Sequence, residues 1–199
     1  MKKTHLVAID VETGGLLPGY HALLQLAAVP SWESEPFNVW IWPDSHEIDP
    51  ESLPISGYSP EAWREKKAVR LGTALEMFRE WLEKAPVEPW KLAPLSHNAG
   101  FDRGFLDAAF RFVGRRSPLG HRWRCSQATL AFLQDADLLP AGSVSLDALA
   151  GLCGLQRSNE AHDALEDARL CMAAYHWLMW LPEVQKEAAV SEAVTPKLN

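Results

Sequence analysis

The apolar residues of this chain form short runs near its beginning and helically spaced sets further on. The segment Leu6–Glu12 is apolar apart from two acids at its end, which predicts a central strand buried on both faces. Leu23–Val29 and Phe37–Trp42 have the composition of two more strands, and with the first they predict an antiparallel meander. Two later strands are expected at Lys91–His97 and Arg122–Cys125.

Helices are predicted between and after these strands. Asp44–Pro60 is polar and is expected to be a loop or a pair of short helical turns, and Ser59 and Pro60 then have the residue types of a helix start. One side of a helix is expected to carry Phe101, Phe105, Ala109 and Phe112. The predicted helices are Val69–Lys84, Phe101–Val113, Ser126–Asp135, Ser145–Gly151 and His162–Leu181. This order predicts an α/β fold with a mixed sheet flanked by helices.

The length and composition are those of an ordinary globular protein. With 199 residues, of which 47% are hydrophobic and 23% charged, the chain suits one domain. We expect this domain at residues 1–182 and a flexible tail at 183–199. No apolar run is long enough for a membrane span, and no signal peptide is indicated, so a cytoplasmic protein is expected. Cys125, Cys153 and Cys171 are widely spaced and are interpreted as reduced thiols.

The net charge of −7 is unlike the basic footprint of a protein that coats nucleic acid, but it leaves a nuclease with clustered acids open. One local basic segment, Arg111–Arg124, is either a phosphate-binding patch or a solvated loop. Nine tryptophans are many for this length, and tryptophan stacks well on bases. Trp81 and Trp177 are expected in the core, whereas polar surroundings favour base or partner contact for Trp63, Trp90 and Trp123.

Two acids stand at the end of the first predicted strand. Asp10 and Glu12 are two residues apart and therefore point to the same side of the strand. Buried together they repel each other, and a divalent cation is the usual remedy. Because only oxygen ligands are available, Mg²⁺ or Mn²⁺ is favoured over zinc. The alternative is a solvated strand end without function.

Two further segments carry candidate polar groups. Asp102 follows a predicted strand and is either functional or an acid favoured by the dipole of a helix N-terminus. His162 and Asp167 are five residues apart, which on a helix places them about 140° from each other. Asp167 is then suited to holding a metal, and His162, near the helix start, to moving a proton. A surface or capping role for His162 is the alternative.

Taken together, three motifs resemble the DEDDh branch of the DEDD 3′-to-5′ exonucleases, the family of proofreading subunits, oligoribonuclease and RNase T. The motifs are Asp10-Val11-Glu12-Thr13, His97-Asn98-Ala99-Gly100-Phe101-Asp102 and His162-Asp163-Ala164-Leu165-Glu166-Asp167. The resemblance implies a ribonuclease-H-like fold whose first three strands are antiparallel and whose later strands run parallel to the first. It also implies that Asp10, Glu12, Asp102 and Asp167 hold two Mg²⁺ or Mn²⁺ ions and that His162 is the general base.

The resemblance further implies a substrate, a single-stranded 3′ end that is shortened by one nucleoside 5′-monophosphate at a time. DNA is slightly favoured over RNA. RNA trimming, oligoribonuclease activity and a silent binding module of the same fold are the alternatives, and a homodimer or a polymerase partner is expected. The residues expected to contact substrate are Thr13, Gly14, Leu16, His97, Asn98 and Phe101.

Two positions depart from the family pattern. Gly14 stands where many members have a second threonine, and Gln25 stands where the second strand usually carries a glutamate. Since an amide carries no charge, the sequence predicts a weakened supporting role for Gln25.

Overall fold

The computed structural model describes residues 4–44, 46–158 and 162–181, and it contains one mixed sheet of five strands. The strand order is β3-β2-β1-β4-β5, and β1 pairs antiparallel with β2, and β2 with β3. β4 lies parallel to β1, and β5 parallel to β4. The strands are β1 (Leu6–Thr13), β2 (Leu23–Pro30), β3 (Phe37–Trp40), β4 (Ala93–Ser96) and β5 (Arg124–Cys125). The predicted meander and the parallel later strands are confirmed.

The helices follow the predicted order with shifts at their ends. Ser59 accepts a hydrogen bond from the amide of Ala62 and caps α2, as its residue type indicates. The polar segment before it forms two short helical turns. The helices are η1 (Pro50–Ser52), α1 (Leu53–Ser56), α2 (Pro60–Glu65), α3 (Leu71–Leu82), η2 (Pro89–Lys91), α4 (Ala99–Phe112), α5 (Ser126–Asp135), α6 (Leu146–Leu152) and α7 (Ala164–Met179).

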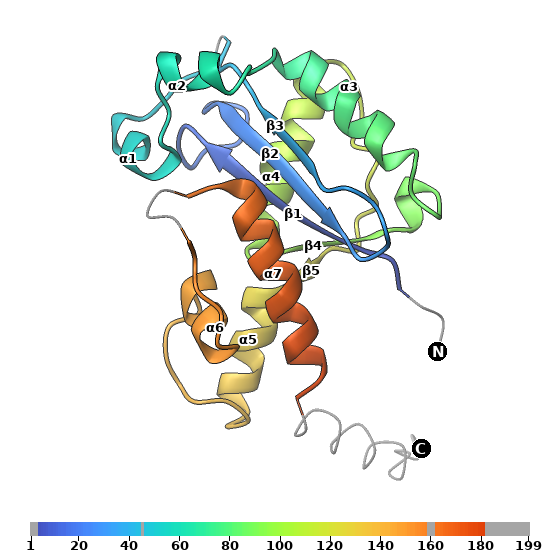
Figure 1. Cartoon of the computed structure of the whole chain (residues 1–199), viewed down its shortest axis with the longest axis vertical. Helices are drawn as coiled ribbons and strands as arrows, with labels where there is room; N and C mark the ends of the chain where they lie inside the picture. The colour runs from blue at the N-terminus through green and yellow to red at the C-terminus, as the bar shows by residue number, and fades with distance from the viewer. Residues whose placement is uncertain (1–3, 45, 159–161, 182–199) are drawn as a thin grey trace, which may run out of the picture.

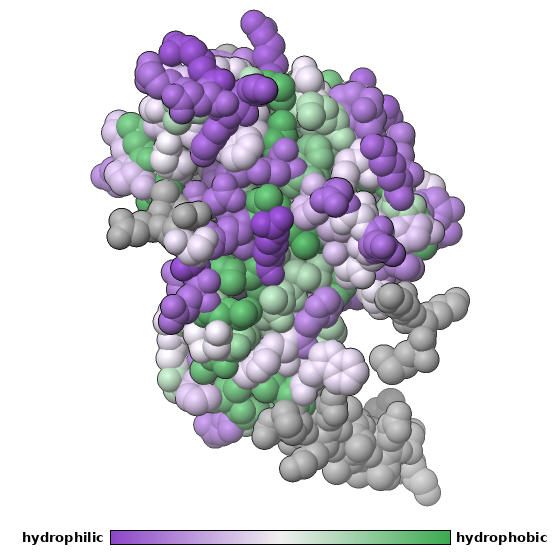
Figure 2. All heavy atoms as spheres, viewed as in Figure 1, coloured by the Kyte–Doolittle hydropathy of each residue, from purple (hydrophilic) through white to green (hydrophobic). Residues whose placement is uncertain are grey.

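Alternation along β1 sends its side chains into two different layers. Val7 and Ile9 pack into a cluster with residues of α3 and α4, whereas Ala8 packs with residues of α6 and α7. Figure 1 shows α7 lying across one face of the sheet and α4 behind the strands, and α3 packs into the same cluster as α4. In Figure 2 hydrophobic residues gather over the lower part of the molecule, where α5, α6 and α7 share an apolar cluster. The acids of β1 therefore point toward the α7 layer.

Three expectations about individual residues are wrong. Phe112 is 58% exposed, and Phe110 is buried instead, because the buried side of α4 includes Asp102 and is rotated from the expected one. Trp63 is fully buried rather than available to a base, and its indole N–H donates to the carbonyls of Leu24 and Ile41. The last helix begins at Ala164, not at His162, because the residue before it is an extended N-cap.

Other expectations concern the ends of the chain and its cysteines. All three cysteines are free, as expected for reduced thiols. Within the described ranges, each helix is either too short or too polar to cross a membrane. The predicted tail at residues 183–199 lies outside the described residues, so its flexibility and the domain boundary at residue 182 stay predictions.

Candidate active site

A cavity of about 390 Å³ opens at the carboxyl ends of β1 and β4 and collects the predicted acids. Asp10 and Glu12 enter it from β1, as the strand alternation requires. Asp102 and Asp167 enter from the first turns of α4 and α7, two helices that lie on opposite faces of the sheet. His162 lines the same cavity from the segment just before α7. The structure thus brings five residues from three distant motifs together.

Burial and mutual repulsion dominate the electrostatics of these acids. Burial, followed by repulsion from Asp102, Glu12 and Asp167, raises the pKa of Asp10 well above its usual range. Burial and then the charge of Asp167 raise the pKa of Glu12 to about 7. Burial likewise raises the pKa of Asp102 to about 8, although nearby hydrogen-bond donors oppose the rise. Their ionised forms are therefore disfavoured in the absence of a positive charge, and a cation bound between the acids would stabilise these forms.

The residues present fit a divalent metal site. Oε1 of Glu12 is buried and makes no hydrogen bond within the described part of the chain, which is costly unless a ligand satisfies it. Glu12, His162 and Asp167 each offer a ligand atom, and these atoms all lie within 4.8 Å of one another. Carboxylate oxygens predominate in the cavity, and this donor set suits Mg²⁺ or Mn²⁺.

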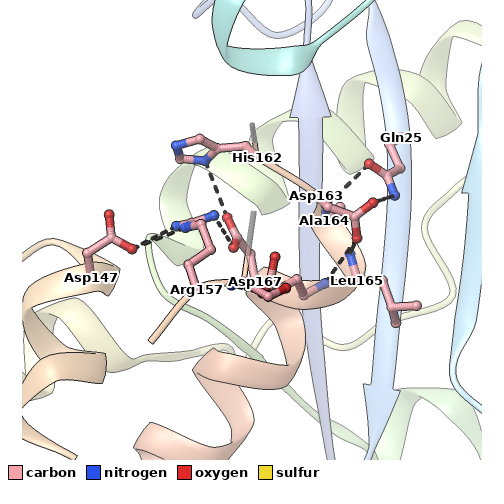
Figure 3. A network of polar contacts seen from close by, with 10 residues as sticks. Gln25, Asp147, Arg157, His162, Asp163, Ala164, Leu165 and Asp167 are labelled. Atoms are coloured by element: carbon pink, nitrogen blue, oxygen red, sulfur yellow. Dashed lines mark hydrogen bonds and ion pairs between the residues drawn. The ribbon is translucent and has the colours of Figure 1, made fainter. Parts of the chain in front are cut away.

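Asp167 is at the centre of a network of charged groups, shown in Figure 3. Its Oδ2 lies 3.3 Å from Nδ1 of His162, and this hydrogen bond raises the pKa of the imidazole. Its Oδ1 pairs with the guanidinium of Arg157, which also contacts Oδ1 of Asp147 at 3.1 Å. Arg157 thus supplies a positive charge to the acidic site.

A second network holds the start of α7 against β2 (Figure 3). Nε2 of Gln25, which is almost completely buried, donates to Oδ1 of Asn38 at 2.9 Å and to Oδ2 of Asp163 at 3.2 Å. Oε1 of the same amide accepts from the backbone N–H of Ala164 at 3.2 Å. Asp163 is the N-cap of α7, and its Oδ1 accepts from two amides of the first turn. Gln25 therefore supports this helix start through both ends of its amide, contrary to the weakened role expected from the sequence.

Of the residues expected to bind the 3′ end of a substrate, some line the cavity and one does not. The hydroxyl of Thr13 lines the cavity and donates to the carbonyl of Gly15 at 2.7 Å. Leu16 also lines the cavity and is 77% exposed. Gly14 does not line the cavity, whereas Gly15 does. A Cβ on Gly14 would lie 3.0 Å from Cγ1 of Ile48, so the close packing of this loop accounts for the absence of a second threonine.

The second motif contributes three lining residues, His97, Asn98 and Phe101. Nε2 of His97 donates to the carbonyl of Val144 at 2.8 Å, and its Nδ1 lies 2.9 Å from the hydroxyl of Ser126. Burial lowers the pKa of this imidazole, so its neutral form ties α5 to the loop before α6. Both ring nitrogens of His97 are therefore engaged, and only the face of its ring is available to a substrate.

The site residues predicted from the sequence do not include Arg157, Asp147 or the residues of η1 and α1 that line the cavity. Ser52 and Ile55 line the cavity from η1 and α1, and the carbonyl of Ile55 accepts a hydrogen bond from the amide of His162. A single arginine in a loop has no spacing or composition that marks it in the sequence. Its role follows only from its contact with a distant acid.

Comparisons with known proteins give a consistent result. Residues 7–175 match the RNase_T exonuclease family model. The chain is 28% identical over 119 residues to the 3′-5′ DNA exonuclease Cap18 of Escherichia coli, covering 59% of this chain and 63% of Cap18. It is 26% identical over 183 residues to the DNA polymerase III subunit epsilon of Salmonella typhimurium, covering 86% of this chain and 70% of that subunit.

A solved structure shows the same fold. The zinc-bound complex of E. coli ExoI with single-stranded DNA superimposes with a TM-score of 0.75 at 19% identity, over 94% of this chain and 43% of that chain. The chain therefore spans less than half of that protein and 63% of Cap18. The ribonuclease-H-like fold expected from the sequence is confirmed.

The fold is that of a class that includes nucleases such as E. coli ExoI, and the clustered carboxylates of the cavity suit a divalent cation. Within this class the chain belongs to the RNase_T exonuclease family. The resemblance to the DEDD exonucleases read from the three motifs is thereby confirmed.

Proposed function

We propose that the protein is a 3′-to-5′ exonuclease that removes nucleoside 5′-monophosphates from single-stranded nucleic acid ends and prefers DNA to RNA. The observation that carries this proposal is the convergence of Asp10, Glu12, Asp102, Asp167 and His162 on one cavity. The acids come from β1, α4 and α7. Burial and then repulsion between neighbouring acids raise the pKa values of Asp10, Glu12 and Asp102, which costs stability and is expected where a cation is to be bound.

We assign to the four acids the binding of two Mg²⁺ or Mn²⁺ ions and no other role in the reaction. These acids are Asp10, Glu12, Asp102 and Asp167. When bound, such a pair of ions neutralises charge on a phosphodiester and activates water for attack. His162 is assigned to accept the proton of the attacking water at Nε2, because Nδ1 faces Asp167. An imidazole suits this role because it titrates near neutral pH.

The substrate end is assigned to the loop after β1. Thr13 and Gly15 offer a hydroxyl and backbone to a terminal sugar, and the exposed Leu16 offers an apolar surface to the last base. Asn98 and Phe101 line the same cavity. An unpaired 3′ end suits this cavity of about 390 Å³, because its terminal nucleotide can enter without a partner strand.

DNA is proposed as the substrate because of the relatives. Cap18 is a 3′-5′ DNA exonuclease, the epsilon subunit belongs to a DNA polymerase, and ExoI is seen with single-stranded DNA. The match to the epsilon subunit also supports a polymerase partner, with a homodimer as the other proposed assembly.

Digestion of 5′-labelled oligonucleotides tests the proposal. Single-stranded DNA, single-stranded RNA and a duplex with a 3′ mismatch are incubated with Mg²⁺ or Mn²⁺, and the matched control is the Asp167→Ala variant. We expect a ladder that shortens from the 3′ end, forms fastest on single-stranded DNA, and disappears in the variant and with chelator. Faster cleavage of RNA than of DNA would show that RNA is the preferred substrate. No ladder from folded protein that binds Mn²⁺ would instead favour a silent binding module.

A further inference from the structure

A second pocket lies at the end of the sheet opposite to the acidic cavity. Thr4 precedes β1, Trp90 and Lys91 precede β4, and Arg122 precedes β5, and all four line a pocket of about 420 Å³. Since β1, β4 and β5 run parallel, their starting ends meet at one edge of the sheet. Thr4 and Asp10 are six residues apart on an extended strand, so the two sites are separated by about 20 Å.

The lining of this pocket is basic and aromatic. Lys91, His121, Arg122 and Arg124 contribute to it, and no Asp or Glu of the described chain does. Lys91 pairs with Glu88 at 2.9 Å, but within the described residues no ion pair is found for Arg122 or Arg124. A pocket with this charge is unexpected on a chain whose net charge is −7.

The aromatic group is Trp90, which is 64% exposed. A Cβ added to Gly120 would lie 2.9 Å from the backbone carbonyl of Trp90, so the loop before β5 packs closely on the turn that carries the indole. This contact involves the backbone and leaves the ring available. Nη1 of Arg124 donates to the carbonyl of Arg122 at 3.0 Å, and no carboxylate partner of either arginine is found within the described residues. An exposed indole beside such guanidinium groups is the combination with which proteins hold single-stranded nucleic acid, through base stacking and phosphate attraction.

We infer that this basic pocket, formed around Trp90, Lys91, Arg122 and Arg124, binds the single-stranded part of the substrate upstream of the 3′ end. The inference rests on the proposed exonuclease function, because the same strand must reach both sites. The predicted patch at Arg111–Arg124 is thereby narrowed to its last part, since Arg115 is engaged by Glu76 on α3. Only a substrate several nucleotides long can span the distance between the sites.

A comparison of short and long substrates distinguishes binding at this pocket from binding at the active site. KM is measured with Mg²⁺ for a dinucleotide and for a single-stranded DNA of about 16 nucleotides, a length typical of extended single-strand sites. The variants are Trp90→Ala and Arg122→Ala, and the matched control is Arg64→Ala, an exposed arginine on α2. We expect KM for the longer substrate to rise about tenfold with either pocket variant. KM for the dinucleotide stays unchanged, and the control affects neither.

A second readout is binding without cleavage. Fluorescence anisotropy with the labelled longer DNA in chelator is repeated over a range of salt, and Arg122→Ala is expected to lower the slope of log affinity against log salt by about 1. This measurement decides the inference even if the wild-type protein cleaves no substrate, in which case only the proposed function fails.

Three results would overturn the inference. The first is a KM and a salt slope for the longer DNA that match those of Arg64→Ala. The second is an equal rise in KM for both lengths, which would indicate damage to the active site. The third is unchanged DNA binding together with lost binding of a labelled polyglutamate peptide, which would assign the pocket to an acidic protein segment.

Discussion

Replacing Gln25 with glutamate tests whether the β2–α7 network keeps the active site assembled. The two side chains have the same shape, but the glutamate cannot donate to Oδ2 of Asp163, 3.2 Å from Nε2 of the amide. Two charges at this distance repel by about 5 kcal/mol at an effective dielectric constant of about 20. The hydrogen bond to Asn38 can be kept, because the amide of Asn38 can turn and donate its own N–H to the new carboxylate.

Part of this cost is avoided because the new carboxyl group can take up a proton and donate through it. The variant is therefore expected to lose about 3–5 kcal/mol of unfolding free energy near pH 8 and much less near pH 5. For a domain of this size, that loss lowers Tm by about 10 °C near pH 8. Thermal unfolding at the two pH values measures the effect, and the control is the neutral Gln25→Ala, whose loss is expected to vary little with pH.

A compensating change sharpens the test. Asp163→Asn keeps an oxygen for the two amides of the first turn of α7 and provides an N–H toward residue 25. The double variant Gln25→Glu, Asp163→Asn should therefore recover most of the Tm and the cleavage rate that Gln25→Glu alone loses. The reasoning is refuted if Gln25→Glu is as stable as the wild type at pH 8, or if the double variant is no better than the single one.

Three other predictions concern the site. His162→Ala should lower the rate constant of cleavage in single-turnover assays by about 10²- to 10⁴-fold, and an unchanged rate constant would show that His162 is not the general base. Glu12 and Asp102 have pKa values raised to about 7 and about 8 from ordinary values of 4.5 and 3.8, so the folded state binds protons more tightly than the unfolded state. In chelator, Tm should be highest near or below pH 4 and fall as pH rises through 7 to 8, and excess Mg²⁺ should reverse the fall; a flat profile would contradict this. Gly14→Thr should cost about 1–3 kcal/mol in chemical denaturation because its Cβ meets Ile48 at 3.0 Å, and wild-type stability would show that the loop yields.

The sequence was sufficient where the signal is local. Helix α5 has the bounds Ser126–Asp135 that apolar spacing predicts, and the strand alternation correctly places Asp10 and Glu12 on one side. These features depend on neighbours within one element. The three motifs, taken in order, then indicated the family. Each motif is local, because it stands at the end of a strand or the start of a helix.

The sequence was insufficient where a residue's partners are distant. Trp63 stands among polar residues, but its indole N–H donates in the core to the carbonyl of Leu24 on β2 and to that of Ile41, the residue after β3. Arg157 has no local signal, since its role is defined by Asp167 and Asp147 across the cavity. The amide of Gln25 was undervalued for the same reason, because its partner Asp163 lies 138 residues away.

The position of α7 in the chain has a consequence for biosynthesis. It follows every other described element in sequence, yet it carries Asp167 and packs on both β1 and β2. A ribosome adds roughly 5–20 residues per second, so β1, α4 and their three acids emerge several seconds before the fourth acid. A nascent chain that has not yet released α7 therefore lacks Asp167, so the proposed metal site is incomplete until this last described helix has left the ribosome.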